Sequence, residues 1–594
     1  MSSLELKIID ILESNLLAIR STSQDDLYAE HGRDVLLKKV QTFMQENRPI
    51  ELLVPAFPCK SPNLKKVCGK LPDGGELYAL EYLNEICREI SFLYEHGCKL
   101  VVWSDGRVFG DLIGVPEVDI ATYEHLLKYY SMTMTHIQWD SMNNYVGTGN
   151  GESLMKIYGT PTFAFDQWLL ESESNREQFV HLRKFMEDDL GNSAKYKDLS
   201  RRQLKSQMSL IAEQMITRNE ALTNLLKQHY PKHIRLSIHQ HPNSGEKFTI
   251  RFFKDSGGRS VLRTPWQNVL VISVEGSLDL MPYRKLHLQS QHVPIMFKNQ
   301  IWCFVQLPQN SPVSVASTIK LSLLGESPRF GLSIDLSKKI DVFQLDVAWM
   351  KMLLEKFGLV VLRRCQNSLD KDNYSQFCEQ FSPPVMWKFG SLLSIKPQLT
   401  PDSSHTSLDS MPLHFDLSFP PEYLFKTGSY NDYVPQYFML YSVKAPPEHG
   451  NGKTTFVNGR LLLESLEEKD ILHWKTIDVS SSMPLSYYGG KTYVYPMIMS
   501  HPKTNENIFR YLEISNNVIH PVESKCSINS VEMDTETFQK FNSIMKQTMR
   551  DPKWYMEHTW NDDDLVIVEN HLLLHGRTAI TEETERELWR IQVY

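Results

Sequence analysis

The first 290 residues of the chain alternate between two spacings of apolar side chains. Residues 32–46 and 75–97 have the spacing of amphipathic helices. Residues 50–57 and 99–106 are short apolar runs typical of buried strands, and both end in polar, turn-forming residues. Short strands separated by helices predict an α/β domain with a mostly parallel sheet, which binds its ligands beyond the carboxyl ends of the strands.

The apolar pattern changes after about residue 290. Residues 307–330 are rich in Ser and Pro, which indicates a boundary, and helical spacing returns only at about 343–356 and 534–548. Short strand-like runs divided by turns fill most of the rest: FGLVVLRRC, QYFMLYSVKA, KTTFVNG, KTYVYPMIM, DDLVIVEN and ELWRIQVY. We therefore predict a first domain over 1–310, a linker over 311–330, and a mostly antiparallel double-sheet domain over 331–594.

Composition narrows the function classes. The chain of 594 residues has 63 Lys and Arg against 71 Asp and Glu, a net charge of −8, and this argues against nucleic-acid binding. Its eight cysteines form no C-x-x-C pair, which indicates neither a zinc ribbon nor a disulfide scaffold. The N-terminus is unlike a signal peptide, and no apolar run approaches the roughly 18 residues of a membrane span. We expect a cytoplasmic protein that acts on small molecules.

Three residues of the second half are candidate metal ligands. His414 and Asp416 lie two apart in the strand-like run LHFDLSFP, so they would share one face. With 20 His in the chain, roughly one His-x-Asp triplet is expected by chance. His575 in HLLLHGR supplies a second histidine. Two histidines and a carboxylate on one side of an octahedron, with open positions opposite, are typical of non-haem Fe(II) oxygenases.

These motifs resemble the taurine dioxygenase-like group of Fe(II)/2-oxoglutarate oxygenases over residues 331–594. The resemblance implies a double-stranded β-helix, or jelly-roll, fold, with Fe(II) held by His414, Asp416 and His575. It also implies 2-oxoglutarate and O₂ as co-substrates. His405, Asp409 and His571 lie near these motifs but off their pattern, and we interpret them as solvated or structural residues.

The resemblance also implies residues for 2-oxoglutarate. In the family an arginine after the distal histidine binds the far carboxylate, and Arg586 has the better spacing, while Arg590 would serve that anion or the substrate's. The matching threonine is Thr454 in GNGKTTF. Lys453 stands before it where the family usually has Asp, so the role of Thr454 is the weaker inference.

A polar row interrupts the first half at IRLSIHQH. Arg235, Ser237, His239 and His241 alternate there, so a strand would place all four on one face, where they suit a phosphate or carboxylate ligand. The competing interpretation is a second metal site formed by His233, His239 and His241, which lacks a nearby carboxylate.

The first half resembles the pyoverdine/dityrosine-biosynthesis family of isocyanide (isonitrile) synthases over about residues 10–300. The motifs that match it in order are LLVPAFPCKSPN, LPDGGELYAL, SDGRVFGDLIGV, RLSIH and TPWQNVLV. The resemblance implies a Rossmann-like domain that converts the amino group of an amino acid to an isocyanide, taking the carbon from ribulose 5-phosphate. Such chemistry requires a phosphate cradle and general acid/base groups rather than a metal.

Polar residues within these motifs are the candidates for those roles. The candidate anion-binding residues are Lys60, Arg107 and Arg235, and the candidate proton-transfer residues are Asp105, Asp111 and His239. The alternative for each is an ion pair or a turn that supports the sheet, and Asp105 would then only cap the segment that follows it.

Together the halves predict a bifunctional enzyme that makes an isocyanide and then oxidises it, by hydroxylation or by desaturation with loss of the carboxylate. Two alternatives remain open. One is an Fe(II)/2-oxoglutarate oxygenase whose first half only recruits the substrate. The other is a degenerate, non-enzymatic protein that binds a sugar or a metal.

Overall fold

A computed structural model gives the fold of residues 1–594. The residues it describes are all except 1–2, 19–24, 148, 192, 194, 255–263, 287–290, 312–316, 402–404, 419–432, 447–450, 483–491, 515–522 and 582–584. The chain divides into two compact units, Met1–Val271 with Leu278–Leu286, and Ile272–Ser277 with His287–Tyr594.

A five-stranded parallel sheet forms the centre of the first unit. Its strands, in the spatial order β3-β2-β1-β4-β5, are β3 (Ile137–Ser141), β2 (Cys98–Ser104), β1 (Ile50–Ala56), β4 (Ile234–Ser237) and β5 (Phe248–Thr249). All five strands therefore end at the same edge of the sheet. The connections reverse direction between β1 and β4, and this is the position where such sheets bind ligands. The predicted parallel α/β architecture is confirmed.

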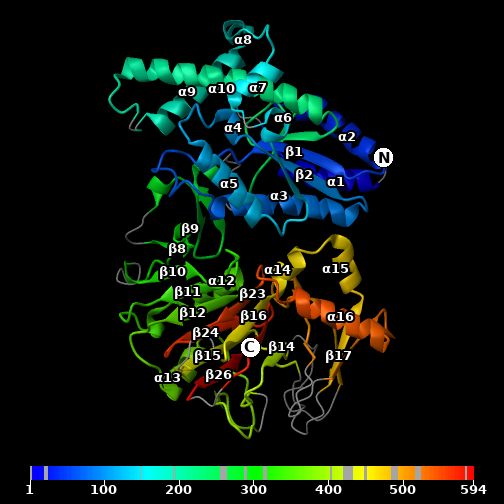
Figure 1. The fold of residues 1–594 in the computed structure, drawn as a ribbon, viewed down its shortest axis with the longest axis vertical. Helices are drawn as coiled ribbons and strands as arrows, with labels where there is room; N and C mark the ends of the chain where they lie inside the picture. The colour runs from blue at the N-terminus through cyan, green and yellow to red at the C-terminus, as the bar shows by residue number, and fades with distance from the viewer. Residues whose placement is uncertain are drawn as a thin grey trace. The chain divides into compact units, whose positions relative to one another are not determined.

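Helices cover both faces of this sheet (Figure 1). The helices of the unit are α1 (Ser3–Asn15), α2 (Arg33–Gln45), α3 (Gly74–Leu93), α4 (Gly106–Phe109), α5 (Glu117–Tyr130), α6 (Asn143–Val146), α7 (Gly151–Tyr158), α8 (Phe165–Glu171), α9 (Glu173–Leu190) and α10 (Arg201–His229). A capping box between Asp73 and Glu76 starts α3. This helix ends four residues before Gly97, which turns the chain into β2 with a φ of +72°. Helix α10 packs Leu222 and Leu225 against Leu53 of β1.

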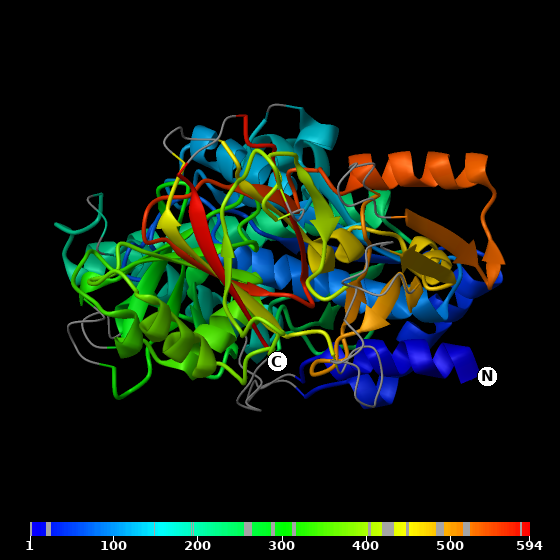
Figure 2. The same ribbon diagram turned by 90° about the horizontal axis from the view of Figure 1, so that it is seen from below.

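The second unit is mostly β-structure. One of its sheets includes β13 (Leu393–Ile395), β26 (Glu587–Val593), β15 (Tyr437–Lys444), β24 (Leu565–Glu569), β12 (Leu359–Arg363), β11 (Leu332–Asp335), β10 (Lys320–Leu323), β8 (His292–Phe297) and β9 (Gln300–Gln306), in this spatial order. Strand β15 pairs on either side with β24 and β26, so the C-terminal strands, drawn in red, lie within the sheet (Figure 2). A second sheet is antiparallel, with the order β14 (Met411–His414), β25 (Leu573–Arg577), β16 (Thr454–Asn458), β23 (Tyr555–His558). Side chains of β15 and β12 from the first of these sheets and of β16 and β25 from the second share one apolar core.

Smaller elements complete the second unit. These are the sheet β18 (Thr492–Pro496), β17 (Ile477–Ser482), β21 (Glu523–Ile528), β22 (Val531–Glu532), the pair β19 (Ile498–Ser500) and β20 (Asn507–Phe509), and the helices α12 (Val347–Phe357), α13 (Lys371–Glu379), α14 (Gly459–Glu464), α15 (Glu468–Trp474) and α16 (Thr535–Thr548). Helices α12 and α16 confirm the two predicted helical insertions. None of the helices described in the structure is long and apolar enough to cross a membrane.

The region expected to be a linker contains a strand. Strand β10 lies within 311–330 and pairs with β8 and β11, because Leu321 is buried between the exposed side chains of Lys320 and Ser322. Strands β6 (Val269–Ile272) and β7 (Leu278–Met281) precede it, close to the division between the two units. The assignment of separate activities to 1–310 and 331–594 stays a prediction.

Candidate functional site

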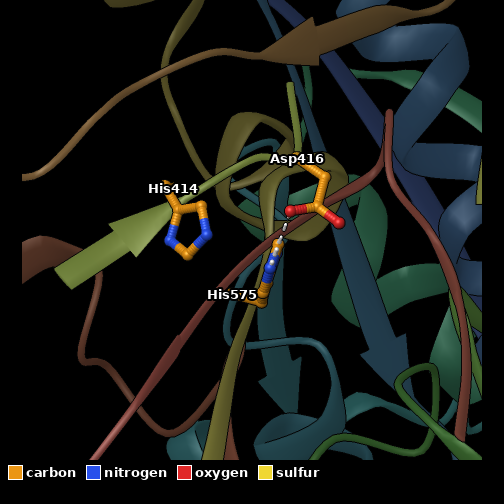
Figure 3. Close-up of side chains that lie close together, drawn as sticks. All are labelled: His414, Asp416 and His575. Atoms are coloured by element: carbon orange, nitrogen blue, oxygen red, sulfur yellow. Dashed lines mark ion pairs between the residues drawn. The ribbon is translucent and has the colours of Figure 1, made fainter. Parts of the chain in front are cut away.

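His414, Asp416 and His575 come together in the second unit. His414 ends β14 and pairs across the sheet with His575 of β25. The chain leaves the strand after His414, so Asp416 reaches the histidines from a turn and not, as predicted, from the face of a strand. The potential ligand atoms all lie within 4.8 Å of one another, and His575 Nε2 lies 3.6 Å from Asp416 Oδ1 (Figure 3).

The charge states of these side chains suit a divalent metal. Burial lowers the pKa of His414 and of His575, so both imidazoles are neutral and keep a lone pair. His414 Nδ1 donates to the carbonyl of Pro412 at 2.9 Å, which leaves Nε2 as the ligand atom. Burial raises the pKa of Asp416, but Arg590 and the two histidines outweigh it and lower this pKa to about 2.

Two polar atoms of these three side chains, Asp416 Oδ2 and His575 Nδ1, are buried without a hydrogen-bond partner among the described residues. Two neutral imidazoles and one carboxylate with a free oxygen fit Fe(II), which prefers nitrogen and oxygen ligands. The described residues form no second group of three such ligands. His233, His239 and His241 therefore do not come together as a metal site.

Asn570 holds the turn that carries Asp416, although no motif in the sequence singles it out. Its Oδ1 accepts from the backbone N–H of Asp416 at 2.9 Å, and its Nδ2 donates to the carbonyls of Asp416 at 3.2 Å and Pro435 at 2.9 Å. Arg510, fully buried, donates to the Asn570 carbonyl at 3.0 Å. The next residue in this turn, Leu417, has a φ of +59°, which an L-residue adopts only when its surroundings enforce it.

We expect Asn570→Ala to weaken Fe(II) binding by about ten- to a hundredfold, the usual effect of removing a residue that orients a metal ligand. The loss arises because Asp416 is then free to turn away from the histidines. Anaerobic titration with Fe(II), or with Co(II) followed by its visible absorption, measures the affinity. Asn367→Ala, at an exposed position of the same unit, is the matched control. Unchanged affinity in Asn570→Ala would contradict the positioning role.

The candidate co-substrate residues lie around the same sheets. Thr454 begins β16, and its Oγ1 accepts from Trp560 Nε1 at 3.1 Å. Arg586 is buried, and burial together with the charge of Arg577 lowers its pKa to about 9. Arg590 Nη1 lies 3.3 Å from Asp416 Oδ1, so it lies beside the metal ligands.

Lys453, which stands where the family usually has Asp, does not contact the candidate metal ligands through a hydrogen bond or ion pair among the described residues. Lys453 Nζ pairs with Glu557 at 2.9 Å, away from Thr454. A Cβ at Gly452, just before Lys453, would lie 2.9 Å from a side-chain carbon of Ile580 and 3.5 Å from Arg586 Nε, so this turn lies next to the guanidinium.

Neighbouring polar residues are structural. Arg577 donates to the backbone carbonyls of His405, Ser407 and Asp409 and so fixes the segment that leads into β14. His571 is buried and accepts from Arg510. Both observations agree with the interpretation of His405, Asp409 and His571 as solvated or structural.

Asp105 stands at the carboxyl end of β2 in the first unit. Its Oδ1 is buried without a hydrogen-bond partner among the described residues, and burial raises its pKa to about 7. It makes no side-chain cap to α4, so capping does not explain it. Gly106, which follows it, packs against the Pro58 carbonyl, and a Cβ at this position would collide with it. The turn at the end of β1, where Phe57 has a φ of +59°, therefore packs against Gly106, the residue after Asp105.

Three other candidates of the first unit form ion pairs. Lys60 Nζ lies 2.8 Å from both Asp73 and Glu76 in a fully buried group. Each pair satisfies charges that burial would otherwise leave uncompensated. Structural roles therefore account for these residues, and catalytic roles for them stay predictions.

The partners of the other two candidates come from neighbouring helices. Arg107 pairs with Glu117 at 2.7 Å and with Glu124, both on α5. Asp111 pairs with Arg218 of α10 at 2.5 Å.

Strand β4 contains only part of the polar row that the sequence predicted to lie on one strand. Strand β4 ends at Ser237, so Arg235 and Ser237 lie on it while His239 and His241 follow in a bend. Ser237 Oγ accepts from the His239 N–H at 3.1 Å and begins this bend. Arg235 stays within the sheet, where Thr223 Oγ1 of α10 accepts from its Nη2 at 3.2 Å.

Two segments of the chain match known protein families, the first mostly within the first unit and the second wholly within the second unit. Residues 40–293 match the family described as pyoverdine/dityrosine biosynthesis protein, and residues 321–592 match taurine catabolism dioxygenase TauD, TfdA family. A parallel α/β unit followed by a β unit with a His–Asp–His cluster thus defines an enzyme of two parts, an isocyanide synthase and a TauD-like oxygenase.

Similar proteins cover both parts. The chain is 32% identical over 272 residues to the L-tryptophan isonitrile synthase AmbI1 of Fischerella ambigua, covering 44% of this chain and 82% of that protein. It is 24% identical over 601 residues to isocyanide synthase A of Aspergillus fumigatus, covering 97% of this chain and 95% of that protein. Its similarity to the tyrosine isonitrile desaturase of Pseudomonas aeruginosa is 26% identity over 277 residues, covering 46% of this chain and 89% of that protein.

The chain belongs to the pyoverdine/dityrosine biosynthesis family of isocyanide synthases. Its C-terminal half is a TauD-like oxygenase, for which Fe(II) is the metal and 2-oxoglutarate and O₂ are the co-substrates.

Proposed function

We propose that this enzyme makes an isocyanide from an L-amino acid, with ribulose 5-phosphate as the carbon source, and then oxidises that isocyanide. The observation that carries the proposal is the buried His414–Asp416–His575 cluster on a chain whose other half belongs to the isocyanide synthase family. A half that belongs to the isocyanide synthase family and a half that carries a candidate metal site suit two successive reactions on one small molecule.

In the second half, the two facing sheets would form a double-stranded β-helix around the metal. His414, Asp416 and His575 would hold Fe(II), which when bound activates O₂ for hydroxylation or for desaturation with loss of the carboxylate. The buried guanidinium of Arg586 would bind the far carboxylate of 2-oxoglutarate bidentately, with Thr454 nearby. Arg590, beside Asp416, would face the substrate's carboxylate.

In the first half, Asp105 would transfer protons. A carboxyl group with a pKa of about 7 is close to equally protonated and ionised at neutral pH, as a group that both accepts and donates a proton requires. Condensation of the amine with the sugar ketone and the later carbon–carbon cleavage each need such transfers. His239, neutral because burial lowers its pKa, is the second proton-transfer candidate, and Arg235 would bind an anionic group.

Incubation of the full chain with amino acids and ribulose 5-phosphate, without iron, tests this assignment. We expect an isocyanide infrared band. After Fe(II), 2-oxoglutarate and O₂ are added, this band should disappear if oxidation consumes the isocyanide group. If the group is kept, the mass of the isocyanide product should change instead. Mass spectrometry identifies the product. If no isocyanide formed from any amino acid offered, the synthase activity would be ruled out.

The raised pKa of Asp105 also predicts how stability depends on pH. An acid whose folded pKa exceeds its ordinary value favours folding while it is protonated, below pH 4, and this contribution is lost as the pH rises through about 7. We expect Asp105→Asn to be more thermostable than the wild type at pH 8, by roughly 2–4 kcal/mol in unfolding free energy, and nearly equal to it at pH 4. Thermal unfolding at both pH values measures this. A difference independent of pH would contradict the raised pKa.

A further inference from the structure

Four basic side chains gather beside strands β4 and β5 of the first unit's sheet, and we name Arg235, His239, His241 and Lys247 the basic cluster. Arg235 lies on β4 beside Leu53 of β1. Lys247 directly precedes Phe248, whose register partner on β4 is the residue after Arg235. In a parallel sheet such neighbours point to the same face, so the Arg235 and Lys247 side chains lie next to each other.

Hydrogen bonds fix the bend that carries the two histidines. Thr249 Oγ1 accepts from the His241 N–H at 2.9 Å and donates to the His239 carbonyl at 3.2 Å. Together with the bond from the His239 N–H to Ser237, these contacts tie the bend to the ends of β4 and β5. The cluster is therefore built on the sheet itself and does not depend on a freely moving loop.

The positive charge of the basic cluster is not balanced by the described residues. Arg235 Nε and Nη1 are buried without a hydrogen-bond partner, and neither Arg235 nor Lys247 forms an ion pair, within the part of the chain that the structure describes. The acid that interacts with both is Glu246, but its carboxylate is half-exposed and pairs with Lys227 at 2.6 Å.

Electrostatic repulsion inside the cluster follows from this imbalance. Burial, and then the charge of Arg235, lowers the pKa of Lys247 to about 8. Burial, Lys247, His239 and Arg235 lower the pKa of His241 to about 2. Charged groups taken out of water normally have a partner. Uncompensated cations beside β1 and β4, between which the connections of the sheet reverse, therefore indicate an anionic ligand.

We propose that Lys247 and Arg235 together bind the phosphate group of the sugar-phosphate substrate, with the imidazole N–H groups of His239 and His241 completing the subsite. The proposal rests on the proposed function. A phosphate monoester carries nearly two negative charges and three acceptor oxygens, which match two cations and two neutral imidazole donors. The carboxylate of an amino acid, with one charge and two oxygens, would leave half of these groups unsatisfied. His239 and His241 follow the carboxyl end of β4, at the edge of the sheet where Asp105 follows β2, while Arg235 and Lys247 lie further back along the strands.

Steady-state kinetics of isocyanide formation in the full chain separate the two anions. In Lys247→Met we expect the KM for ribulose 5-phosphate to rise at least about tenfold, with the KM for the amino acid within about twofold of the wild type. Inorganic phosphate should compete with ribulose 5-phosphate in the wild type and compete far more weakly in the variant. Lys247→Arg keeps the charge and should restore most of the affinity, and it also serves if the methionine variant does not fold. Lys232→Met, an exposed lysine just before β4 that pairs with Glu46, is the matched control.

The outcomes separate the two proposals. If the wild type makes isocyanide and only the KM for the amino acid rises in Lys247→Met, the cluster holds the carboxylate and the phosphate assignment is wrong. It is also wrong if neither KM changes. If the wild type makes no isocyanide, the proposed function fails, and the binding of inorganic phosphate followed by ³¹P NMR still decides the subsite. Phosphate binding that is lost in Lys247→Met and kept in Lys232→Met supports the assignment, and equal binding in all three proteins overturns it.

Discussion

We expect that replacing His414 with alanine abolishes oxidation of the isocyanide and leaves its formation intact. Among the described residues, His414 supplies one of three candidate ligands within 4.8 Å of one another, and its loss leaves an incomplete set for Fe(II). Removing a residue that merely orients a ligand costs about ten- to a hundredfold, so removing the ligand should reduce oxidation by more than a hundredfold. The unoxidised isocyanide should accumulate, and mass spectrometry together with its infrared band would detect it.

The control for this variant is His473→Ala, which removes an exposed histidine of α15 in the same half. It should oxidise the isocyanide at the wild-type rate. Oxidation retained by His414→Ala would place the metal elsewhere. Loss of isocyanide formation in the same variant would mean that the two activities do not belong to separate halves.

Asp105→Asn has the converse effect. We expect isocyanide formation to fall by about 10²–10⁴-fold, the usual contribution of a general acid or base, because an amide cannot accept and return a proton. The variant should still bind Fe(II) and should still oxidise a synthetic isocyanide substrate. Measuring both activities on the same preparation separates loss of catalysis from loss of the fold.

Asp10→Asn, at an exposed carboxylate of α1, is the matched control for this experiment. The pH dependence gives a second readout. In the wild type, the rate of isocyanide formation should change with a midpoint near pH 7, and this transition should vanish from the residual rate of Asp105→Asn. Full activity in the asparagine variant would mean that the buried carboxyl only fills space.

Much of the fold could be predicted from local patterns. The apolar runs at 50–57 and 99–106 became β1 and β2, and 75–97 contains α3, because strands and helices bury side chains with different periods. The predicted linker was the weakest part, since a strand of four residues with one buried leucine has almost no pattern to detect.

The candidate site was predicted unevenly. His414, Asp416 and His575 are residue types that bind metals, and the first two stand in a short motif. The three come together as predicted. Lys60 and Arg107 look like anion-binding residues in sequence and Asp111 like a proton-transfer residue, but their partners Glu76, Glu124 and Arg218 come from other segments and satisfy their charges. Lys247 stands in a polar run of the sequence but was not among the candidate site residues, and Asn570 was not singled out, because nothing in an isolated lysine or asparagine distinguishes one that faces a buried arginine or positions a metal ligand.

The sequence by itself determined the two kinds of domain, the family of each half, and the three residues that meet as candidate metal ligands. Burial and long-range contacts decided the rest: that Asp416 approaches from a turn held by Asn570, that the pKa of Asp105 is raised to about 7, and that Arg235 has no ion-pair partner among the described residues. Residue types and their spacing are written along the chain. The charge state of a side chain depends instead on its desolvation and on the charges around it, and these exist only after distant segments have packed together.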